Sequence, residues 1–123
     1  MITSVKLVGV CVTDQDRALD FYTKTLGFKL ITDTPMGPEA RWIEVAPPGA
    51  ETHLALWTPP GMEDRVGTFS TVVFRSDDVD KTYDELERRG VKFTDKPHDQ
   101  PGGKMGIFED PDGNKFVLRG PGN

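Results

Sequence analysis

The side chains best suited to carry chemistry are one histidine and two glutamates. His53 and Glu44 lie on neighbouring predicted strands, and Glu109 lies on a third. A catalytic divalent metal needs three or four imidazole, carboxylate or thiolate donors that converge on it. These three residues would form such a set if all of them faced the same side of a sheet. In the alternative interpretation, both glutamates are solvated and His53 is a polar residue in or beside a cavity.

The other reactive groups have structural explanations. Cys11 lies in an apolar strand-like run, where a lone cysteine is more often a small buried hydrophobe than a nucleophile. Tyr22 and Tyr83 fall on apolar helical stripes, which predicts that they pack in the core. His98 lies in a Gly/Pro-rich segment and is expected to be exposed. The Asp-Pro-Asp-Gly segment at 110–113 resembles a catalytic acid pair but is typical of a turn.

The elements that position these groups are predicted from periodicity. Val8, Val10 and Val12 alternate with other side chains as in a strand, Asp14 caps a helix, and Gly27 ends that helix. Extended patterns follow at 28–32, 40–46 and 52–58, and a Pro/Gly turn joins the last two.

The second half of the chain repeats this order. A strand is predicted at 69–75, then a helix that begins at Asp77 or Asp78 and ends at Gly90. Further strands are predicted at 91–94, 104–109 and 114–119, with a Pro/Gly loop at 96–103. The offset between the halves is 63 residues from Asp14 to Asp77, whereas the first strands align better at 64.

Each half therefore reads βαβββ. A unit this short cannot bury both faces of its sheet alone, so two of them must pair. The predicted fold class is α+β, with module 1 at about 4–58 and module 2 at about 69–119 of a single domain, 1–123.

Composition restricts the partners. The 15 basic and 20 acidic residues give a net charge of −5 that is spread along the chain, which disfavours nucleic acid and anionic membranes. A single cysteine excludes an intramolecular disulfide. No apolar run approaches the ~20 residues of a membrane helix, and the N-terminus lacks a signal-peptide pattern. The expected location is the cytoplasm.

Several short motifs, in this order and spacing, resemble those of the vicinal-oxygen-chelate superfamily, which includes glyoxalases, bleomycin-resistance proteins and extradiol dioxygenases. They are Val10–Asp14, Arg17–Tyr22, Leu26–Phe28, Asp77–Asp80 and Phe108–Asn114. The resemblance implies paired βαβββ modules that form a curved sheet around a cavity, with the helices on the convex face. It also implies frequent dimers and, in the enzymes of the family, a divalent metal that acts as a Lewis acid.

The resemblance places the metal ligands of the family at positions that are held here by Leu7, Ala55, Thr71 and Val117. Leucine, alanine and valine side chains have no lone pair for a metal, and threonine is a weak ligand. A two-residue slip in register would replace Ala55 by His53, so at most one strong donor remains. We therefore expect no bound metal and no other cofactor.

Without a metal, the concave face is expected to be an aromatic and apolar pocket with a few polar groups, which is typical of small-molecule sites. Trp42 and Trp57 would stack on a flat ligand, or would instead fill the core or a dimer interface. The predicted ligand-binding residues are Leu7, Cys11, Trp42, His53, Ala55, Trp57, Thr71, Val73, Arg75, Met105 and Val117.

The sequence favours a metal-free, homodimeric protein that sequesters a small organic or aromatic ligand. The main alternative is a metal-dependent lyase, isomerase or dioxygenase with relocated ligands, namely His53, Glu44 and Glu109. A metal-free enzyme that uses His53 and an accessory domain with a vestigial cavity are further alternatives. The sequence leaves open the identity of the ligand and whether modules pair within one chain or between two.

Overall fold

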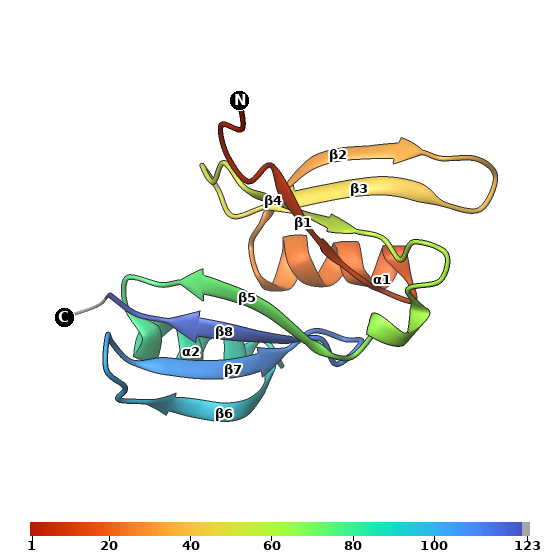
Figure 1. The fold of residues 1–123 in the computed structure, drawn as a ribbon. Helices are drawn as coiled ribbons and strands as arrows, with labels where there is room; N and C mark the ends of the chain where they lie inside the picture. Colours follow the sequence, from red (N-terminus) through yellow and green to blue (C-terminus); the bar gives the residue numbers. More distant parts are fainter. Residues whose placement is uncertain (122–123) are drawn as a thin grey trace. The chain divides into compact units, whose positions relative to one another are not determined.

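The computed structural model describes residues 1–121 and divides the chain into two compact units, residues 1–66 and a second unit that begins at Gly67. Each unit consists of a four-stranded sheet with one principal helix, and the path of the chain through both can be followed in Figure 1. The first contains β1 (Leu7–Val10), α1 (Gln15–Asp20), a π-helical turn η1 (Phe21–Thr25), β2 (Lys29–Pro35), β3 (Arg41–Ala46), β4 (His53–Leu56) and a 3₁₀ turn η2 (Glu63–Arg65). The second contains β5 (Phe69–Arg75), α2 (Val79–Arg88), β6 (Lys92–His98), β7 (Met105–Glu109) and β8 (Lys115–Arg119).

The two sheets have the same topology. The strand orders are β1-β4-β3-β2 and β5-β8-β7-β6, and neither sheet closes on itself. In each, the first strand runs parallel to the last strand of its unit, and the other neighbours are antiparallel. The predicted α+β class with two βαβββ modules is confirmed.

Each core forms where apolar side chains of one sheet face meet the helix. In the first unit, α1 packs on β3 and β4, and Tyr22, Ile43, Val45 and Leu56 have no exposed surface. In the second unit, α2 packs on β6, and Phe108 stacks on Phe116. Burial of one such side chain stabilises a fold by about 1.5–3 kcal/mol, so these rows fix which sheet face points away from the helix.

The first helix contains a turn that the periodicity did not predict. Asp14 caps α1 and Asp78 caps α2, each by accepting a hydrogen bond from the backbone N–H three residues later. Asp78 rather than Asp77 is the cap, so the 64-residue offset of the first strands continues to the caps. The extra residue lies inside the first helix. The π-helical turn η1 accommodates it, because a π-turn closes its hydrogen bond one residue later than an α-turn.

Two strand predictions were too short. β2 continues to Pro35, and β6 continues to His98 through the beginning of the predicted 96–103 loop. Both strands lie at sheet edges, and each pairs with its neighbour through a register shift. An edge strand tolerates a proline such as Pro97, because one side of its backbone needs no ladder partner. His98 therefore lies at a strand end and contacts Asp95 there.

Of the helices in residues 1–121, none is long and apolar enough to cross a membrane.

Candidate functional site

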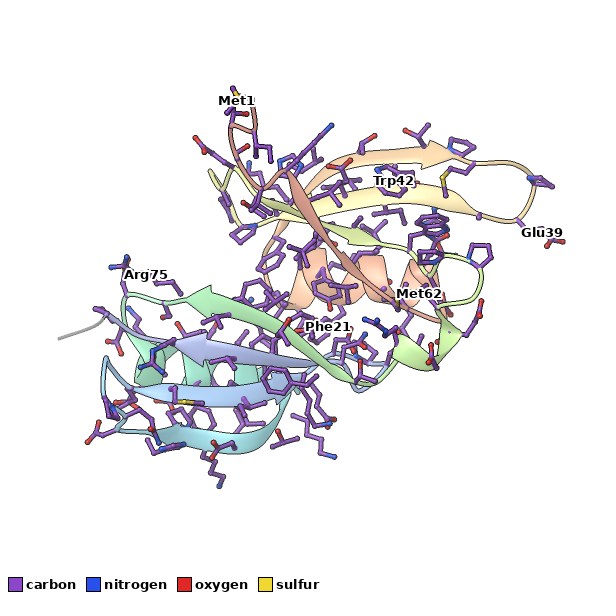
Figure 2. All side chains as sticks on the ribbon, viewed as in Figure 1. Met1, Phe21, Glu39, Trp42, Met62 and Arg75 are labelled. Carbon is purple, nitrogen blue, oxygen red and sulfur yellow. The ribbon has the colours of Figure 1, made fainter. Side chains whose placement is uncertain are left out.

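The face of the first sheet that points away from α1 carries the candidate site. Ile43 and Val45 on β3 are buried on the helix side, so Trp42 and Glu44, which alternate with them, lie on the other face. Figure 2 shows Trp42 on β3. His53 begins β4, and Trp57 directly follows the end of that strand. We call Trp42, Glu44, His53 and Trp57 the indole–carboxylate site.

Glu44 is the centre of this site. Its Oε2 accepts a hydrogen bond from Trp42 Nε1 at 2.7 Å, and its Oε1 lies 2.8 Å from His53 Nδ1. The side chain is buried, with 9% of the residue exposed, although no lysine or arginine among residues 1–121 forms an ion pair with it. The bond from the Trp42 indole and then the bond from His53 lower the pKa of Glu44, against the opposing effect of burial. The carboxylate is therefore ionised at neutral pH.

The ionised carboxylate fixes the orientation of the imidazole. An ionised carboxylate only accepts hydrogen bonds, so Nδ1 of His53 must carry the proton in their 2.8 Å contact. When the ring is neutral, Nε2 then holds the lone pair. A histidine oriented by a carboxylate in this way can act as a hydrogen-bond acceptor or as a general base.

Two small residues, Ala55 and then Gly9, follow Glu44 across the neighbouring strands of the sheet. In the sheet register, Glu44 is opposite Ala55, and Ala55 is opposite Gly9 on β1. Leu7 is opposite His53 in the same ladder. A Cβ atom at Gly9 would meet nothing within 4 Å, so the sheet face is open at that point. The methyl group of Ala55 is almost covered, with 2% of the residue exposed, and its small size leaves room for the Glu44 side chain to reach His53.

The two tryptophans contact each other at one end of this face. Their ring centroids are 5.4 Å apart, with the ring planes inclined by 60°. Trp57 also lines an open pocket of about 390 Å³, a volume in the range of small-molecule sites. The other residues that line this pocket are Val12, Thr13, Gln15, Ala40, Thr58, Glu63 and Val66.

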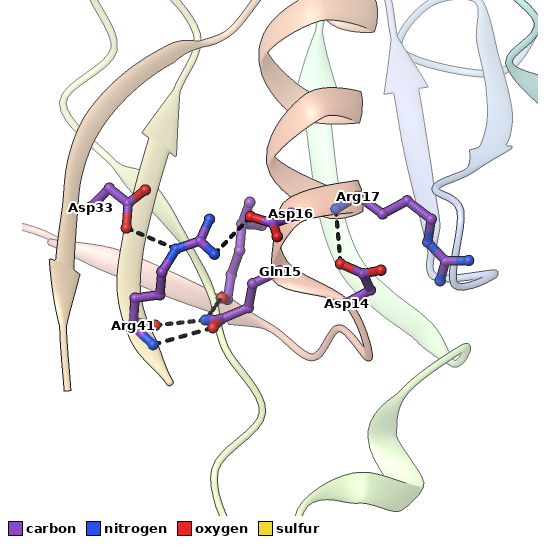
Figure 3. A network of polar contacts seen from close by, with 7 residues as sticks. Asp14, Gln15, Asp16, Arg17, Asp33 and Arg41 are labelled. Atoms are coloured by element: carbon purple, nitrogen blue, oxygen red, sulfur yellow. Dashed lines mark hydrogen bonds and ion pairs between the residues drawn. The ribbon is translucent and has the colours of Figure 1, made fainter. Parts of the chain in front are cut away.

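Gln15 holds the two strands that carry the tryptophans. Its Nε2 donates hydrogen bonds to the carbonyl oxygens of Arg41 at 2.6 Å and Leu56 at 2.9 Å, and its Oε1 accepts from the Arg41 N–H (Figure 3). Trp42 and Trp57 are the residues directly after these two backbone positions. The first turn of α1 therefore fixes the spacing of the indoles.

Arg41 strengthens the same attachment. Its guanidinium bonds Asp33 on β2 at 3.0 Å and Asp16 on α1 at 2.7 Å (Figure 3). The Asp16 bond is the largest cause of a raised pKa for Arg41. The β2–β3 edge is thereby tied to the helix that carries Gln15.

The first unit contains six of the predicted site residues, and the structure brings most of them together. Trp42 and His53 bond Glu44, and Ala55 is its register partner. Trp57 contacts Trp42, and Leu7 is opposite His53. Cys11 follows β1 directly and is half-buried.

The second unit contains the other five predicted site residues, and they form a neighbouring set within its own sheet. Val73 pairs with Val117, and Arg75 and Met105 both pair with Arg119. Thr71 has a φ of 63°, which is rare for a β-branched residue, and it lies within the register shift of β5. The sequence predicted an uninterrupted strand at 69–75 and gave no sign of this shift.

The donors present do not fit a catalytic divalent metal. The four positions given by the family resemblance hold three aliphatic side chains and Thr71. Within residues 1–121, no group of three or more His, Cys, Asp or Glu side chains is arranged to hold a metal ion. Glu44 and His53 bond each other, whereas Glu109 in the second unit forms ion pairs with Lys115 at 3.2 Å and Lys92 at 3.8 Å.

Sequence reasoning missed several residues at the site. Thr32 and Thr34 on β2 lie opposite Glu44 and Trp42, and their hydroxyl oxygens are 3.0 Å apart. Their alternation was visible, but the strand was predicted to end at 32. Gln15 gave the weak signal of an uncharged polar residue in the first turn of a helix. Nothing in the sequence indicated that Glu63 lines a pocket.

Comparison with known proteins gives a consistent result. The family model for the Glyoxalase/Bleomycin resistance protein/Dioxygenase superfamily matches residues 4–118. The Bacillus subtilis protein YetH, described as uncharacterized, is 40% identical over 119 residues, which is 97% of this chain and 99% of YetH.

Two solved structures are similar over nearly the whole chain. TnmS3, an antibiotic binding protein from Streptomyces sp. CB03234, superposes with a TM-score of 0.87 and 43% identity, covering 98% of this chain and 97% of TnmS3. A member of the same superfamily from Sphaerobacter thermophilus gives a TM-score of 0.87 and 40% identity, covering 97% and 98% of the two chains.

Proposed function

The chain belongs to the Glyoxalase/Bleomycin resistance protein/Dioxygenase superfamily, and we propose that it is a metal-free member that sequesters a small aromatic ligand at the indole–carboxylate site. Small-molecule binding is supported at the level of the family, because TnmS3 is described as an antibiotic binding protein. The proposal for this chain is more specific in two respects, the absence of a metal and the aromatic nature of the ligand.

The observation that carries the proposal is the composition of the sheet face that points away from α1. Two indoles meet there at 5.4 Å beside a pocket of about 390 Å³, and the buried carboxylate is already satisfied by two donors. Aromatic rings gain about 0.5–1.5 kcal/mol from each well-placed aromatic neighbour beyond the area they bury. Such a face favours a flat, uncharged or cationic molecule, and the net charge of −5 disfavours an anion.

The test is a thermal-shift screen of aromatic compounds on protein dialysed against EDTA. Compounds that stabilise the native protein are expected, and Trp57→Ala should weaken their binding by about thirtyfold or more, as for a dominant contact residue. Tyr83→Phe, at a half-buried tyrosine of α2 that packs against Phe93 in the second unit, is the aromatic control and should bind like the native protein. A screen without hits, or hits that Trp57→Ala leaves unchanged, would contradict the proposal.

A second candidate function is favoured by the contact between His53 and Glu44. The 2.8 Å bond orients the imidazole as the histidine of a catalytic acid–base pair is oriented, so a metal-free enzyme that uses His53 as a general base is the alternative. Turnover of a ligand found in the screen would favour this alternative if His53→Ala abolished it. Turnover that persists in His53→Ala would remove His53 from the mechanism.

The proposal includes a homodimer in the cytoplasm. Leu30 and Ile31 on the edge strand β2 are 48% and 47% exposed, and apolar side chains along a sheet edge are typical of surfaces that pair with another chain. Light scattering of the purified protein measures the oligomeric state. The mass of a single chain at micromolar concentration would contradict the dimer.

A further inference from the structure

The imidazole of His53 has one nitrogen engaged and one open. Nδ1 bonds Glu44, whereas Nε2 has no hydrogen-bond partner within residues 1–121. The His53 side chain is 23% exposed, so a ligand can reach it. Polar atoms on a mostly apolar binding face determine which polar groups of a ligand are recognised.

Glu44 places the ring proton on Nδ1, and Trp42 holds the carboxylate that does so. An indole N–H can only donate, so Glu44 must accept from Trp42 through Oε2. The lowered pKa of Glu44 keeps the carboxylate ionised, and its second oxygen must therefore accept from His53. The chain of contacts from indole to carboxylate to imidazole leaves Nε2 as a lone-pair acceptor when the ring is neutral.

The carboxylate also fixes this acceptor, because its bond to Nδ1 holds the ring in one tautomer and one orientation. An imidazole nitrogen with a lone pair accepts more strongly from an acidic donor, so a phenolic or enolic O–H is a better partner than an alkyl hydroxyl. A carboxylate ligand is disfavoured, because it has no proton to donate and would lie near the negative charge of Glu44.

The surroundings of His53 leave room for such a ligand. Leu7 is the register partner of His53, and the open backbone at Gly9 continues the same face next to Ala55. A flat ring lying along this row would keep its apolar surface on the sheet and could direct a hydroxyl group toward His53.

We propose that His53 Nε2 is the polar recognition point of the indole–carboxylate site and accepts a hydrogen bond from the acidic hydroxyl group of an aromatic ligand. This inference rests on the proposed function and adds the chemical class of the ligand, an aromatic compound with a phenolic or enolic O–H. Glu44 and Trp42 act through His53 and are positioning residues.

The experiment compares two probes, 2-naphthol and 2-methoxynaphthalene, which share the ring system and differ in the hydroxyl proton. Calorimetric titration of the native protein should give about threefold to tenfold tighter binding of 2-naphthol, the value of one net hydrogen bond. His53→Asn should bind both probes equally, because the asparagine amide can still donate to Glu44 whereas the Nε2 acceptor is lost. His98→Asn, at the other histidine of the chain, is the matched control and should keep the preference.

Nitrogen-15 NMR of the histidine rings supplies a second readout. The His53 ring should have its proton on Nδ1, and 2-naphthol should shift the Nε2 resonance whereas 2-methoxynaphthalene should not. Glu44→Gln should make the proton position less defined, because the glutamine amide can also donate.

The outcomes separate the two proposals. If neither probe binds, the proposed aromatic site is contradicted. If both probes bind equally to the native protein, the aromatic site stands and the recognition point at His53 is overturned. A preference for 2-naphthol that survives in His53→Asn, or a His53 proton on Nε2, would also overturn it.

Discussion

Nδ1 of His53 lies 2.8 Å from Oε1 of Glu44, so an imidazole from β4 is held by a carboxylate from β3 at the centre of an otherwise apolar and aromatic sheet face. The pairing engages the Glu44 carboxylate and one of the two imidazole nitrogens. It also leaves one imidazole nitrogen open toward a ligand. The predictions below follow from this contact and from the residues that hold it in place.

Glu44→Gln should destabilise the protein in a pH-dependent way. The hydrogen bonds from Trp42 and His53 lower the native pKa of Glu44, so its stabilising contribution is complete above the ordinary glutamate pKa of about 4.3 and is lost as the pH falls through the lower native value. At pH 7 the variant should lose about 1.5–3 kcal/mol of unfolding free energy.

Urea unfolding at pH 7 and below pH 4 measures this difference. The difference in unfolding free energy between the native protein and Glu44→Gln should be smaller at the lower pH. Glu51→Gln, which changes an exposed glutamate in the turn before β4, should leave the unfolding free energy within about 0.5 kcal/mol of native at both. If the difference in unfolding free energy between the native protein and Glu44→Gln were the same at both pH values, the bonds from Trp42 and His53 would not be stabilising an ionised Glu44.

Gln15→Ala should loosen the pair of tryptophans. The substitution removes three hydrogen bonds to the backbone of Arg41 and Leu56, and we expect a loss of about 1–3 kcal/mol of unfolding free energy. The two indole N–H signals in a proton–nitrogen NMR spectrum report on the spacing of the rings and should both shift. Gln100→Ala, which changes the other glutamine, should alter neither the unfolding free energy nor the indole signals. Indole signals at their native positions in Gln15→Ala would show that the hydrogen bonds of Gln15 do not position the two rings.

The topology could be predicted because the face pattern repeats in both halves. Val8 and Val10 align with Val72 and Phe74, and this alignment fixed two βαβββ units without a structure. The π-turn at 21–25 could not be predicted, because no residue type favours it and only the one-residue difference between the halves revealed an insertion. The edge strands were too short in the prediction because their register shifts interrupt the alternation.

The face on which the site residues lie could be predicted, but not all of the contacts between them. The alternation along β3 placed Trp42 and Glu44 on one face, but whether Glu44 could reach His53 depended on a register that a slip of one residue would reverse. The contacts of Gln15, and the part of the pocket lined by Thr58, Glu63 and Val66, depend on how the chain packs after β4. The sequence of that segment has no periodic pattern from which its packing could be predicted.

Asn114→Ala should destabilise the second unit without affecting the indole–carboxylate site. Asn114 is 3% exposed, accepts from the Gly67 N–H at 2.8 Å and donates to Asp110 at 2.8 Å, so its loss leaves buried polar groups unpaired. We expect a loss of about 2–3 kcal/mol of unfolding free energy in urea. Asp99→Ala, which changes an exposed residue in the loop before β7, should lower the unfolding free energy by less than about 0.5 kcal/mol. A near-native value for Asn114→Ala would contradict a structural role for this turn.

His98 should titrate above the ordinary histidine pKa. The hydrogen bond from its ring to Asp95 is the largest cause of the raised pKa, and Asp95→Asn should bring the value back down. Proton NMR of the ring across pH 5 to 9 measures both. An unchanged His98 pKa in Asp95→Asn would show that the contact does not form in solution.

Metal dependence of binding tests the central claim most directly. The dissociation constant of 2-naphthol is measured by calorimetry on EDTA-dialysed protein, alone and after one equivalent of Ni²⁺ or Zn²⁺ is added. Metal-free binding to the indole–carboxylate site predicts the same micromolar dissociation constant in all three titrations, with no tight stoichiometric uptake of the ion. Binding that appears only after the ion is held by the protein would contradict it.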